Sequence, residues 1–208
     1  MRQENKQQGT GDWFSQRIGK LTASRMSDAM SFTKKGTDAS ERIKLKMEIV
    51  TERMTDIIVP KYINAAMQWG IDHEPLAKQN FESYTGILIQ DVGFVPHPTI
   101  ENFGASPDGF TSDGYLIETK CPSSTTHLKY LLDKDNVPEE YKPQMCVQAL
   151  CTGRKKIWFV SYDPRFPPKQ QMFVKLYEPT QEELDKVQDA AIKFLAEVEE
   201  LFDNVIGA

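Results

Sequence analysis

The sequence has few cysteines, and their number excludes two kinds of stabilised scaffold. It contains three, Cys121, Cys146 and Cys151, and no two of them form a CxxC pair. Three thiols cannot all pair within one chain, so the sequence predicts neither a disulfide framework nor a closed zinc site. His73 and His97 have no third partner at metal-ligand spacing, which also argues against zinc. The pattern indicates a protein of the reducing cytoplasm.

Long hydrophobic runs are missing as well. No apolar stretch approaches the ~20 residues that cross a bilayer, so we expect no membrane contact. The N-terminus is polar and lacks the apolar segment of a signal peptide. We expect residues 1–11 to form a flexible arm. Because no repeat or low-complexity linker divides the 208 residues, we expect residues 1–208 to form a single domain.

The sequence also lacks an excess of positive charge. It has 25 Lys and Arg against 30 Asp and Glu, a net charge of −5, and a pI of about 5.3. A nucleic-acid partner would therefore require cations concentrated in a groove or channel. Residues 17–20, 34–35 and 154–156 are short cationic runs, although most such runs are only solvated surface.

Apolar periodicity predicts an α/β fold with a sheet at its core. Helical patterns occur at residues 13–19, 22–30, 40–59, 62–85, 124–132, 138–151 and 180–202. Strand patterns occur at residues 87–97, 103–111, 115–120, 156–162 and 172–177, the first three forming an antiparallel meander. We expect the helix at 62–85 to be interrupted or kinked near Gly70 and Pro75 and to stop at Gly86. Thr180 and Glu183 form a predicted capping box.

Residues 104–122, GASPDGFTSDGYLIETKCP, place charged residues on two neighbouring predicted strands. Glu118 and Lys120 are two positions apart, so their side chains point to the same face of a strand. Asp108 comes from the strand before, and we expect Gly109 to allow unusual backbone dihedrals beside it. The alternative explanation is an exposed ion pair, which contributes little to stability.

These residue types suit metal-assisted hydrolysis of a phosphodiester. Mg²⁺ prefers carboxylate and water oxygens, and a cation near the attacking water or the scissile phosphate assists the reaction. The spacing Pro107-Asp108-x₉-Glu118-x-Lys120 is that of the PD-(D/E)xK nuclease motif. The spacing alone is a loose pattern, and its place on paired strands flanked by helices makes it more specific.

Further blocks make the chain resemble the YqaJ-type, phage lambda-type alkaline exonucleases. In the family's order they are WFSQR with LTAS (13–24), WGIDHE with FESYTG (69–86), ASPDG with ETKCP (105–122), YKPQ (141–144) and WFVSYDPR (158–165). They span roughly residues 12–178 of the chain. The resemblance implies a restriction-endonuclease-like core, in which helices flank a central mixed β-sheet.

The resemblance also implies a role for each matching residue of the metal site. Asp108 and Glu118 are implied metal ligands, and the backbone carbonyl of Thr119 is a further ligand. Lys120 orients or deprotonates the attacking water. Glu74 completes the metal site, either directly or through water. Without the resemblance, Glu74 would be an ordinary residue on the surface of a helix.

Three more residues are implied at the edge of the site. Gln144 lies on its rim with Tyr141 nearby, and Arg17 and Ser24 match the positions that hold the 5′-phosphate left after each cleavage. The alternatives are a solvated glutamine, a surface arginine and a helix N-cap at Ser24. Gln148 departs from the pattern, because the broader nuclease motif often has an aromatic residue there.

The implied activity is Mg²⁺-dependent 5′→3′ digestion of one strand of linear double-stranded DNA, which leaves a 3′ single-stranded overhang for recombination. The resemblance implies two Mg²⁺ ions per site, for which Mn²⁺ can substitute. It implies a homotrimeric ring that encloses double-stranded DNA ends and a single-strand annealing protein as partner. It also implies a phage or prophage gene whose product acts in the bacterial cytoplasm.

Two other interpretations remain open at this point. One is an endonuclease or a RecB- or Cas4-like nuclease of the same superfamily. The Cas4-like class often carries four cysteines for an iron–sulfur cluster, and this chain has three. The other is a catalytically silent DNA-binding relative, against which the intact set of Asp108, Glu118 and Lys120 argues.

Overall fold

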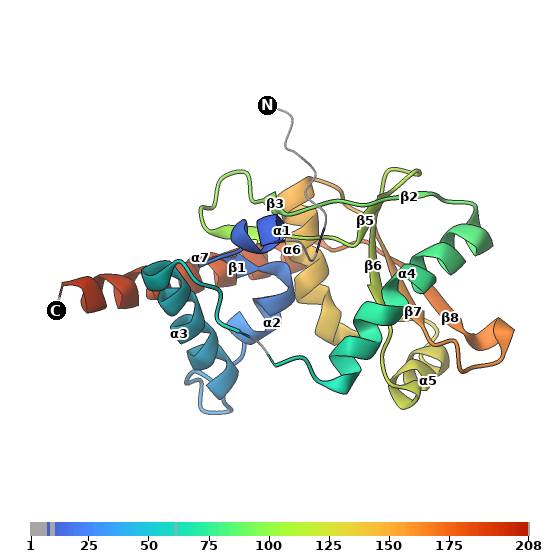
Figure 1. Cartoon of the computed structure of the whole chain (residues 1–208), viewed down its shortest axis with the longest axis horizontal. Coiled ribbons are helices and arrows are strands. Elements are labelled where there is room, and N and C mark those ends of the chain that lie inside the picture. Colours follow the sequence, from blue (N-terminus) through green and yellow to red (C-terminus); the bar gives the residue numbers. More distant parts are fainter. Residues whose placement is uncertain (1–7, 9–10, 61, 208) are drawn as a thin grey trace.

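The chain forms helices and strands in the mixed order that an α/β fold requires (Figure 1). In this computed structural model, which describes residues 8, 11–60 and 62–207, the α-helices are α1 (Gly11–Ser15), α2 (Met26–Ala29), α3 (Ser40–Thr55), α4 (Ala65–Thr85), α5 (Ser124–Leu132), α6 (Lys142–Thr152) and α7 (Gln181–Ile206). The strands are β1 (Leu21–Thr22), β2 (Ile89–Gln90), β3 (Val95–Pro96), β4 (Phe103–Ala105), β5 (Gly109–Thr111), β6 (Leu116–Lys120), β7 (Ile157–Tyr162) and β8 (Met172–Tyr177). Short 3₁₀ turns are η1 (Ala23–Arg25), η2 (Glu139–Tyr141) and η3 (Pro168–Gln170).

Most of the expected arm, residues 1–11, lies outside the described residues. Gln8 is described, and its side-chain amide donates to the backbone carbonyls of Val92 and Pro107 at 3.1 and 2.7 Å. Gly11 already belongs to α1. The described part of this segment is therefore held against the strand region near the predicted site.

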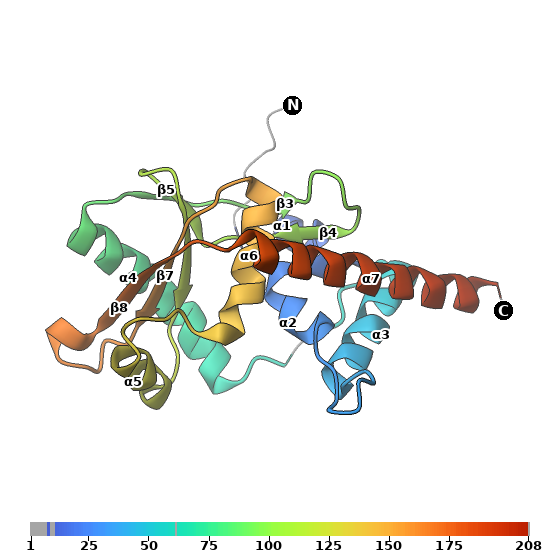
Figure 2. The same ribbon diagram turned by 180° about the vertical axis from the view of Figure 1, so that it is seen from behind.

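The central sheet is mixed, with the strand order β2-β5-β6-β7-β8. Within this sheet β6 and β7 pair in parallel, and the other neighbouring strands are antiparallel. A second sheet has the order β1-β4-β3. Because alternate residues of a strand face opposite sides, Ile117 packs against Phe81 of α4, whereas Leu116 joins the main core with residues of α6 and α7. Figure 2 shows α7 from the side opposite to Figure 1.

The predicted meander is only partly right, because two of its strands are divided between the sheets. The segment 87–97 forms β2 and β3, and the segment 103–111 forms β4 and β5. β2 pairs with β5 in the central sheet, and β3 pairs with β4 in the small one. Alternation of apolar residues indicates a strand but not its partner, so the sequence pattern could not locate these breaks.

Glycine permits the close approach of neighbours at both divided strands. A Cβ on Gly104 would lie 2.2 Å from the Phe94 ring, and one on Gly109 would lie 2.4 Å from Ile89. Gly109 does not have a positive φ angle. The expectation of unusual dihedrals at Gly109 is therefore wrong, and this glycine is needed because a side chain would collide with β2.

Several helices differ from their predicted extents, and the segment predicted as one helix at residues 22–30 is divided into η1 and α2. α3 stops at Thr55 and not near Pro60, because Asp56 takes the left-handed conformation with φ 53° and its N–H bonds the Glu52 carbonyl. α4 continues through Pro75 without interruption. The predicted end at Gly86 and the capping box at the start of α7 are confirmed. None of the described helices combines the length and the apolar character needed to cross a membrane.

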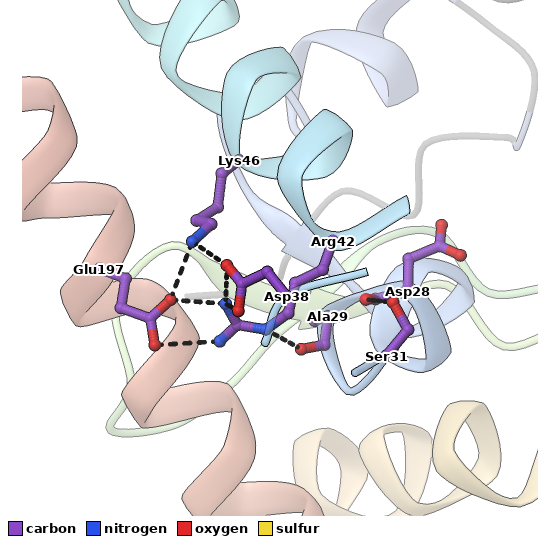
Figure 3. A network of polar contacts seen from close by, with 7 residues as sticks. All are labelled: Asp28, Ala29, Ser31, Asp38, Arg42, Lys46 and Glu197. Carbon is purple, nitrogen blue, oxygen red and sulfur yellow. Dashed lines mark hydrogen bonds and ion pairs between the residues drawn. The ribbon is translucent and has the colours of Figure 1, made fainter. Parts of the chain in front are cut away.

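A buried guanidinium joins α3 to α7 (Figure 3). Arg42 is 1% exposed and donates to both Asp38 oxygens, to both Glu197 oxygens and to the Ala29 carbonyl. Lys46 contacts the same two carboxylates. A buried charge is tolerated when it is paired and fully hydrogen-bonded. This network fixes α3, which forms one wall of the cavity described below.

Candidate active site

Asp108 stands directly before β5 and is held by the neighbouring strand β6. The backbone N–H and the hydroxyl of Thr119 donate to Asp108 Oδ2 at 2.6 and 2.7 Å. Within the described residues no donor reaches the other oxygen, Oδ1. Asp108 is 8% exposed, so its carboxylate is fixed from one side and keeps one oxygen for a further ligand.

Glu118 is fully buried, and donors reach both of its carboxylate oxygens. Oε1 accepts from Gln144 Nε2 at 2.6 Å and contacts the Lys120 ammonium. Oε2 accepts from Gln148 Nε2. The prediction that Glu118 and Lys120 share one strand face is therefore confirmed. Gln144 and Gln148 are one turn apart on α6, so the same helix face meets both oxygens.

Glu74 comes to this region from α4. Its Oε1 lies 3.0 Å from Lys78 Nζ, and Lys78 also contacts the exposed Asp91 at 3.2 Å. Burial raises the pKa of Glu74, and the negative charge of Asp108 raises it further. Pro75 does not break the helix, so Glu74 is presented from a continuous helical turn.

The carboxylates of this site repel one another. Burial raises the pKa of Glu118 to about 7, and the negative charge of Asp108 also raises it. The charge of Lys120 and the hydrogen bonds from Lys120 and Gln148 lower it in part. Burial lowers the pKa of Lys120, but the charges of Glu118 and Asp108 outweigh it and leave the pKa above its ordinary value. A nearby positive charge favours the ionised form of a buried carboxyl group such as Glu118, and such perturbed groups are typical of functional sites.

Without divalent cations, we expect the free energy of unfolding to decrease as the pH rises from about 4.5 to about 7. Glu118 has an ordinary pKa of 4.5 and a folded pKa of about 7, so the folded state binds more protons in this range. Its contribution is complete below pH 4.5 and is lost as the pH rises through 7. Urea unfolding in EDTA across this range measures the slope. Glu118→Gln should reduce the slope, and an unchanged slope in that variant would contradict the assignment.

The carboxylates form a partial set of cation ligands. Within the described residues, no group of three or more His, Cys, Asp or Glu side chains could hold a metal ion by itself. The oxygens on hand are Asp108 Oδ1 and Glu118 Oε2, which has one donor. Mg²⁺ is usually bound through one or two carboxylates, with water and substrate phosphates completing its shell. The donor set therefore fits Mg²⁺ better than a metal that requires a closed protein cage.

A cavity of about 1110 Å³ connects this site with the predicted phosphate-binding residues. Its lining includes Arg17 and Ser24 together with Glu74, Thr119 and Lys120. These residues come from the N-terminal segment, α4 and β6, so segments far apart in the sequence face one space. The structure thus brings members of the two predicted groups to a common cavity, while Asp108, Glu118 and Gln144 lie behind its lining residues Thr119 and Lys120.

Arg17 is a partly buried cation in the wall of this cavity. Its guanidinium donates to Ser106 Oγ at 2.8 Å and to Thr22 Oγ1 at 3.4 Å, and it lies 4.2 Å from the centre of the Trp13 ring. Burial lowers its pKa to about 10, and the charge of Glu52 opposes that shift. Among the described residues, no carboxylate lies within ion-pair distance of Arg17.

Ser24 is exposed and lies inside the 3₁₀ turn η1. Its hydroxyl is 3.5 Å from Thr22 Oγ1, which in turn accepts from Arg17. The alternative that Ser24 caps a helix is wrong, because Thr22 holds the cap position of η1 without a side-chain bond. Ser24 is therefore linked to Arg17 through one intervening hydroxyl.

Sequence reasoning missed three residues that contact the site. They are Lys78, Ser106 and Gln148. Two signals were present in the sequence. Glu74 and Lys78 have the i,i+4 spacing of a helical ion pair, and Gln144 and Gln148 have the same spacing. Nothing in the sequence indicated that Ser106 bonds Arg17, since that contact joins residues 89 positions apart.

Comparison with protein families and curated proteins addresses the identity of the chain. The YqaJ-like viral recombinase domain matches residues 12–155, which is more than half of the 208 residues. No curated protein matches the chain. The family match contains every predicted site residue.

Solved structures give a second comparison. The alkaline exonuclease LHK-Exo from Laribacter hongkongensis is 39% identical over 94% of this chain and 96% of its own, with a TM-score of 0.85. LHK-Exo in complex with dAMP gives 38% identity with the same coverage and TM-score. A phage-related exonuclease from Haemophilus somnus 129PT, at 13% identity, 90% and 95% coverage and a TM-score of 0.64, supports the fold alone.

The similarity confirms the predicted restriction-endonuclease-like core, with a mixed sheet flanked by helices. It also agrees with the order of the sequence blocks, since the match extends over nearly the whole chain. The chain therefore belongs to the YqaJ-like viral recombinase family and is a nuclease that acts in recombination.

Proposed function

We propose that the protein is a Mg²⁺-dependent 5′→3′ exonuclease that digests one strand of linear double-stranded DNA and leaves a 3′ overhang. The observation that carries the proposal is the shared cavity, which is lined by Arg17 together with Thr119, Lys120 and Glu74. A 5′-phosphate at Arg17 would direct the next phosphodiester toward the carboxylates. This arrangement would give the 5′→3′ polarity, and the dAMP bound by LHK-Exo is of the size expected for a released nucleotide.

The proposed site holds two Mg²⁺ ions, for which Mn²⁺ can substitute. Asp108 Oδ1, Glu118 Oε2 and the Thr119 carbonyl would supply protein ligands, and Glu74 would complete the site directly or through water. Bound Mg²⁺ would supply Lewis-acid stabilisation of the charge that develops on the phosphate oxygens. Ionised Glu118 is favoured above its pKa of about 7, in keeping with the alkaline activity that gives LHK-Exo its description.

Lys120 acts in this proposal as a hydrogen-bond donor. Its raised pKa keeps the ammonium protonated at neutral pH, so it orients the attacking water or stabilises negative charge and does not remove a proton. The ammonium lies against Glu118 and 5.1 Å from the centre of the Tyr141 ring. Gln144 holds the same Glu118 oxygen from the rim of the site.

Digestion of linear and covalently closed circular duplexes tests the proposal. With Mg²⁺, we expect linear DNA to be degraded while circles resist, because an exonuclease needs an end. A label at the 5′ terminus should be released before one at the 3′ terminus. EDTA is the control for metal dependence. Cleavage of both substrates would indicate an endonuclease or a related nuclease, and cleavage of neither a catalytically silent DNA-binding protein.

The proposal extends to the assembly in which the enzyme works. We propose a homotrimeric ring around double-stranded DNA and a single-strand annealing protein as partner, in the cytoplasm of a bacterium that carries the phage or prophage. The match to a viral recombinase domain supports this setting. The net charge of −5 also favours a ring whose cations face inward, since Arg17, Lys20 and Lys120 line the cavity.

A further inference from the structure

Gln148 is a buried amide for which core packing gives no reason. It is fully buried on α6, and its Nε2 donates to Glu118 Oε2. Its own Oε1 is buried and has no hydrogen-bond partner among the described residues. The amide cannot turn to satisfy Oε1 without placing that oxygen against the carboxylate and removing the donor.

An unpaired buried acceptor destabilises a folded protein. An apolar side chain of similar volume, such as methionine, would fill the same space without this cost. The feature that only the amide provides is the hydrogen bond to Glu118. The Gln148 side chain therefore provides a hydrogen bond to the Glu118 carboxylate, although its unpaired Oε1 lowers local stability.

The donors to the two oxygens of Glu118 differ in their surroundings. Oε1 accepts from Gln144 and contacts Lys120, both of which are partly exposed. Among the described residues, Oε2 accepts only from Gln148, which is out of reach of solvent. Each carboxylate oxygen has two acceptor positions, so Oε2 keeps one for a cation while Gln148 occupies the other.

We infer that Gln148 is a positioning residue that fixes the orientation of the Glu118 carboxylate for cation binding. It acts from the core side, where neither DNA nor solvent can replace it. Gln144 and Lys120 contact the other oxygen and are accessible to substrate. The inference rests on the proposed function in one respect, namely that Glu118 is a ligand of the catalytic cation.

Gln148→Met tests the inference because it keeps the side-chain volume and removes the donor. We expect kcat on linear duplex to fall about 10- to 100-fold, with KM for DNA ends unchanged, which is the usual effect of removing a partner of a metal ligand. Mn²⁺ binding to the DNA-free protein, measured by calorimetry, should weaken by a similar factor. Gln148→Asn should behave alike, because its amide is one methylene too short to reach Glu118.

Cys146→Ala provides a matched control on the same helix. Cys146 is buried and contacts the Tyr177 hydroxyl at 3.6 Å, and it is not among the described hydrogen-bond partners of Glu118. The change creates a cavity and should lower the melting temperature, while kcat and Mn²⁺ affinity stay at the wild-type level. This separates loss of stability from loss of carboxylate orientation.

The outcomes distinguish the inference from the function on which it rests. A wild-type protein that leaves linear DNA intact would refute the proposed exonuclease, while the Mn²⁺ measurement would still report on Gln148. If Gln148→Met digests DNA and binds Mn²⁺ as the wild type does, the inference is overturned and the exonuclease stands. If neither Gln148 variant folds, Gln148 is a residue of core stability and the inference is likewise overturned.

Discussion

Asp108→Ala and Glu118→Ala should each reduce Mg²⁺-dependent hydrolysis of linear duplex DNA by roughly 10³-fold or more. Each change removes a proposed cation ligand, and a bound metal contributes several kcal/mol of transition-state stabilisation, at about 1.4 kcal/mol per tenfold in rate. The two side chains are buried carboxylates, Asp108 directly before β5 and Glu118 on β6, the strand that pairs with β5. Single-turnover cleavage of end-labelled duplex measures the chemical step without the contribution of product release.

Asp113→Ala is the matched control for these two variants. Asp113 lies in the turn between β5 and β6, where its carboxylate accepts from Thr111 and Trp158. The Asp113→Ala substitution therefore removes a hydrogen-bonded carboxylate from the same hairpin and does not change a residue that lines the cavity. Near wild-type cleavage by Asp108→Ala or Glu118→Ala would show that the carboxylate is not a ligand. Loss of cleavage in Asp113→Ala to the same degree would assign the effects to damage of the hairpin.

The paired strands of the site were predictable because their signals are local. The i,i+2 rule placed Glu118 and Lys120 on one face, and that geometry depends only on the strand being extended. The turn at residues 112–114 joins β5 and β6 as the sequence indicates. The spacing from Asp108 to Glu118 then brings the two carboxylates to neighbouring strands.

Contacts between distant elements could not be read from the sequence in the same way. The i,i+4 spacing of Gln144 and Gln148 shows that they share a helix face, but not that this face meets Glu118. The same limit explains the divided strands, since Gly104 is required by the ring of Phe94, which belongs to another segment. The continuity of α4 through Pro75 is a third case, in which a local helix-breaking signal does not end the helix.

The position of Ser24 in a 3₁₀ turn bears on how a 5′-phosphate would be held. α2 has four residues and follows a 3₁₀ turn, so a long helix with an N-terminus aimed at the ligand is not what the structure provides. Recognition would depend instead on the guanidinium of Arg17 and on nearby hydroxyls. In the part of the chain that the structure describes, Arg17 bonds the neutral partners Ser106 and Thr22, and a partly buried cation with neutral partners is stabilised when an anion binds.

Arg17→Ala should therefore remove most of the preference of the enzyme for 5′-phosphorylated over 5′-hydroxyl duplex ends. A hydrogen-bonded charged group contributes about 1.5–3 kcal/mol, which corresponds to roughly 10- to 150-fold in rate. Arg17→Lys should restore only part of the preference, because an ammonium cannot bond two phosphate oxygens in the fixed geometry of a guanidinium. The ratio of initial digestion rates on the two substrates is the measurement.

Arg25→Ala is the control that separates phosphate recognition from general positive charge. Arg25 lines the same cavity, but its guanidinium is already paired with Asp28 and Glu48 at 2.7 Å each. Removing it should change stability and leave the phosphate preference intact, since its charge is neutralised within the protein. If Arg25→Ala lowers the preference as much as Arg17→Ala does, the cavity attracts DNA by its overall field. If wild-type enzyme digests both kinds of end equally fast, Arg17 does not anchor the terminal phosphate.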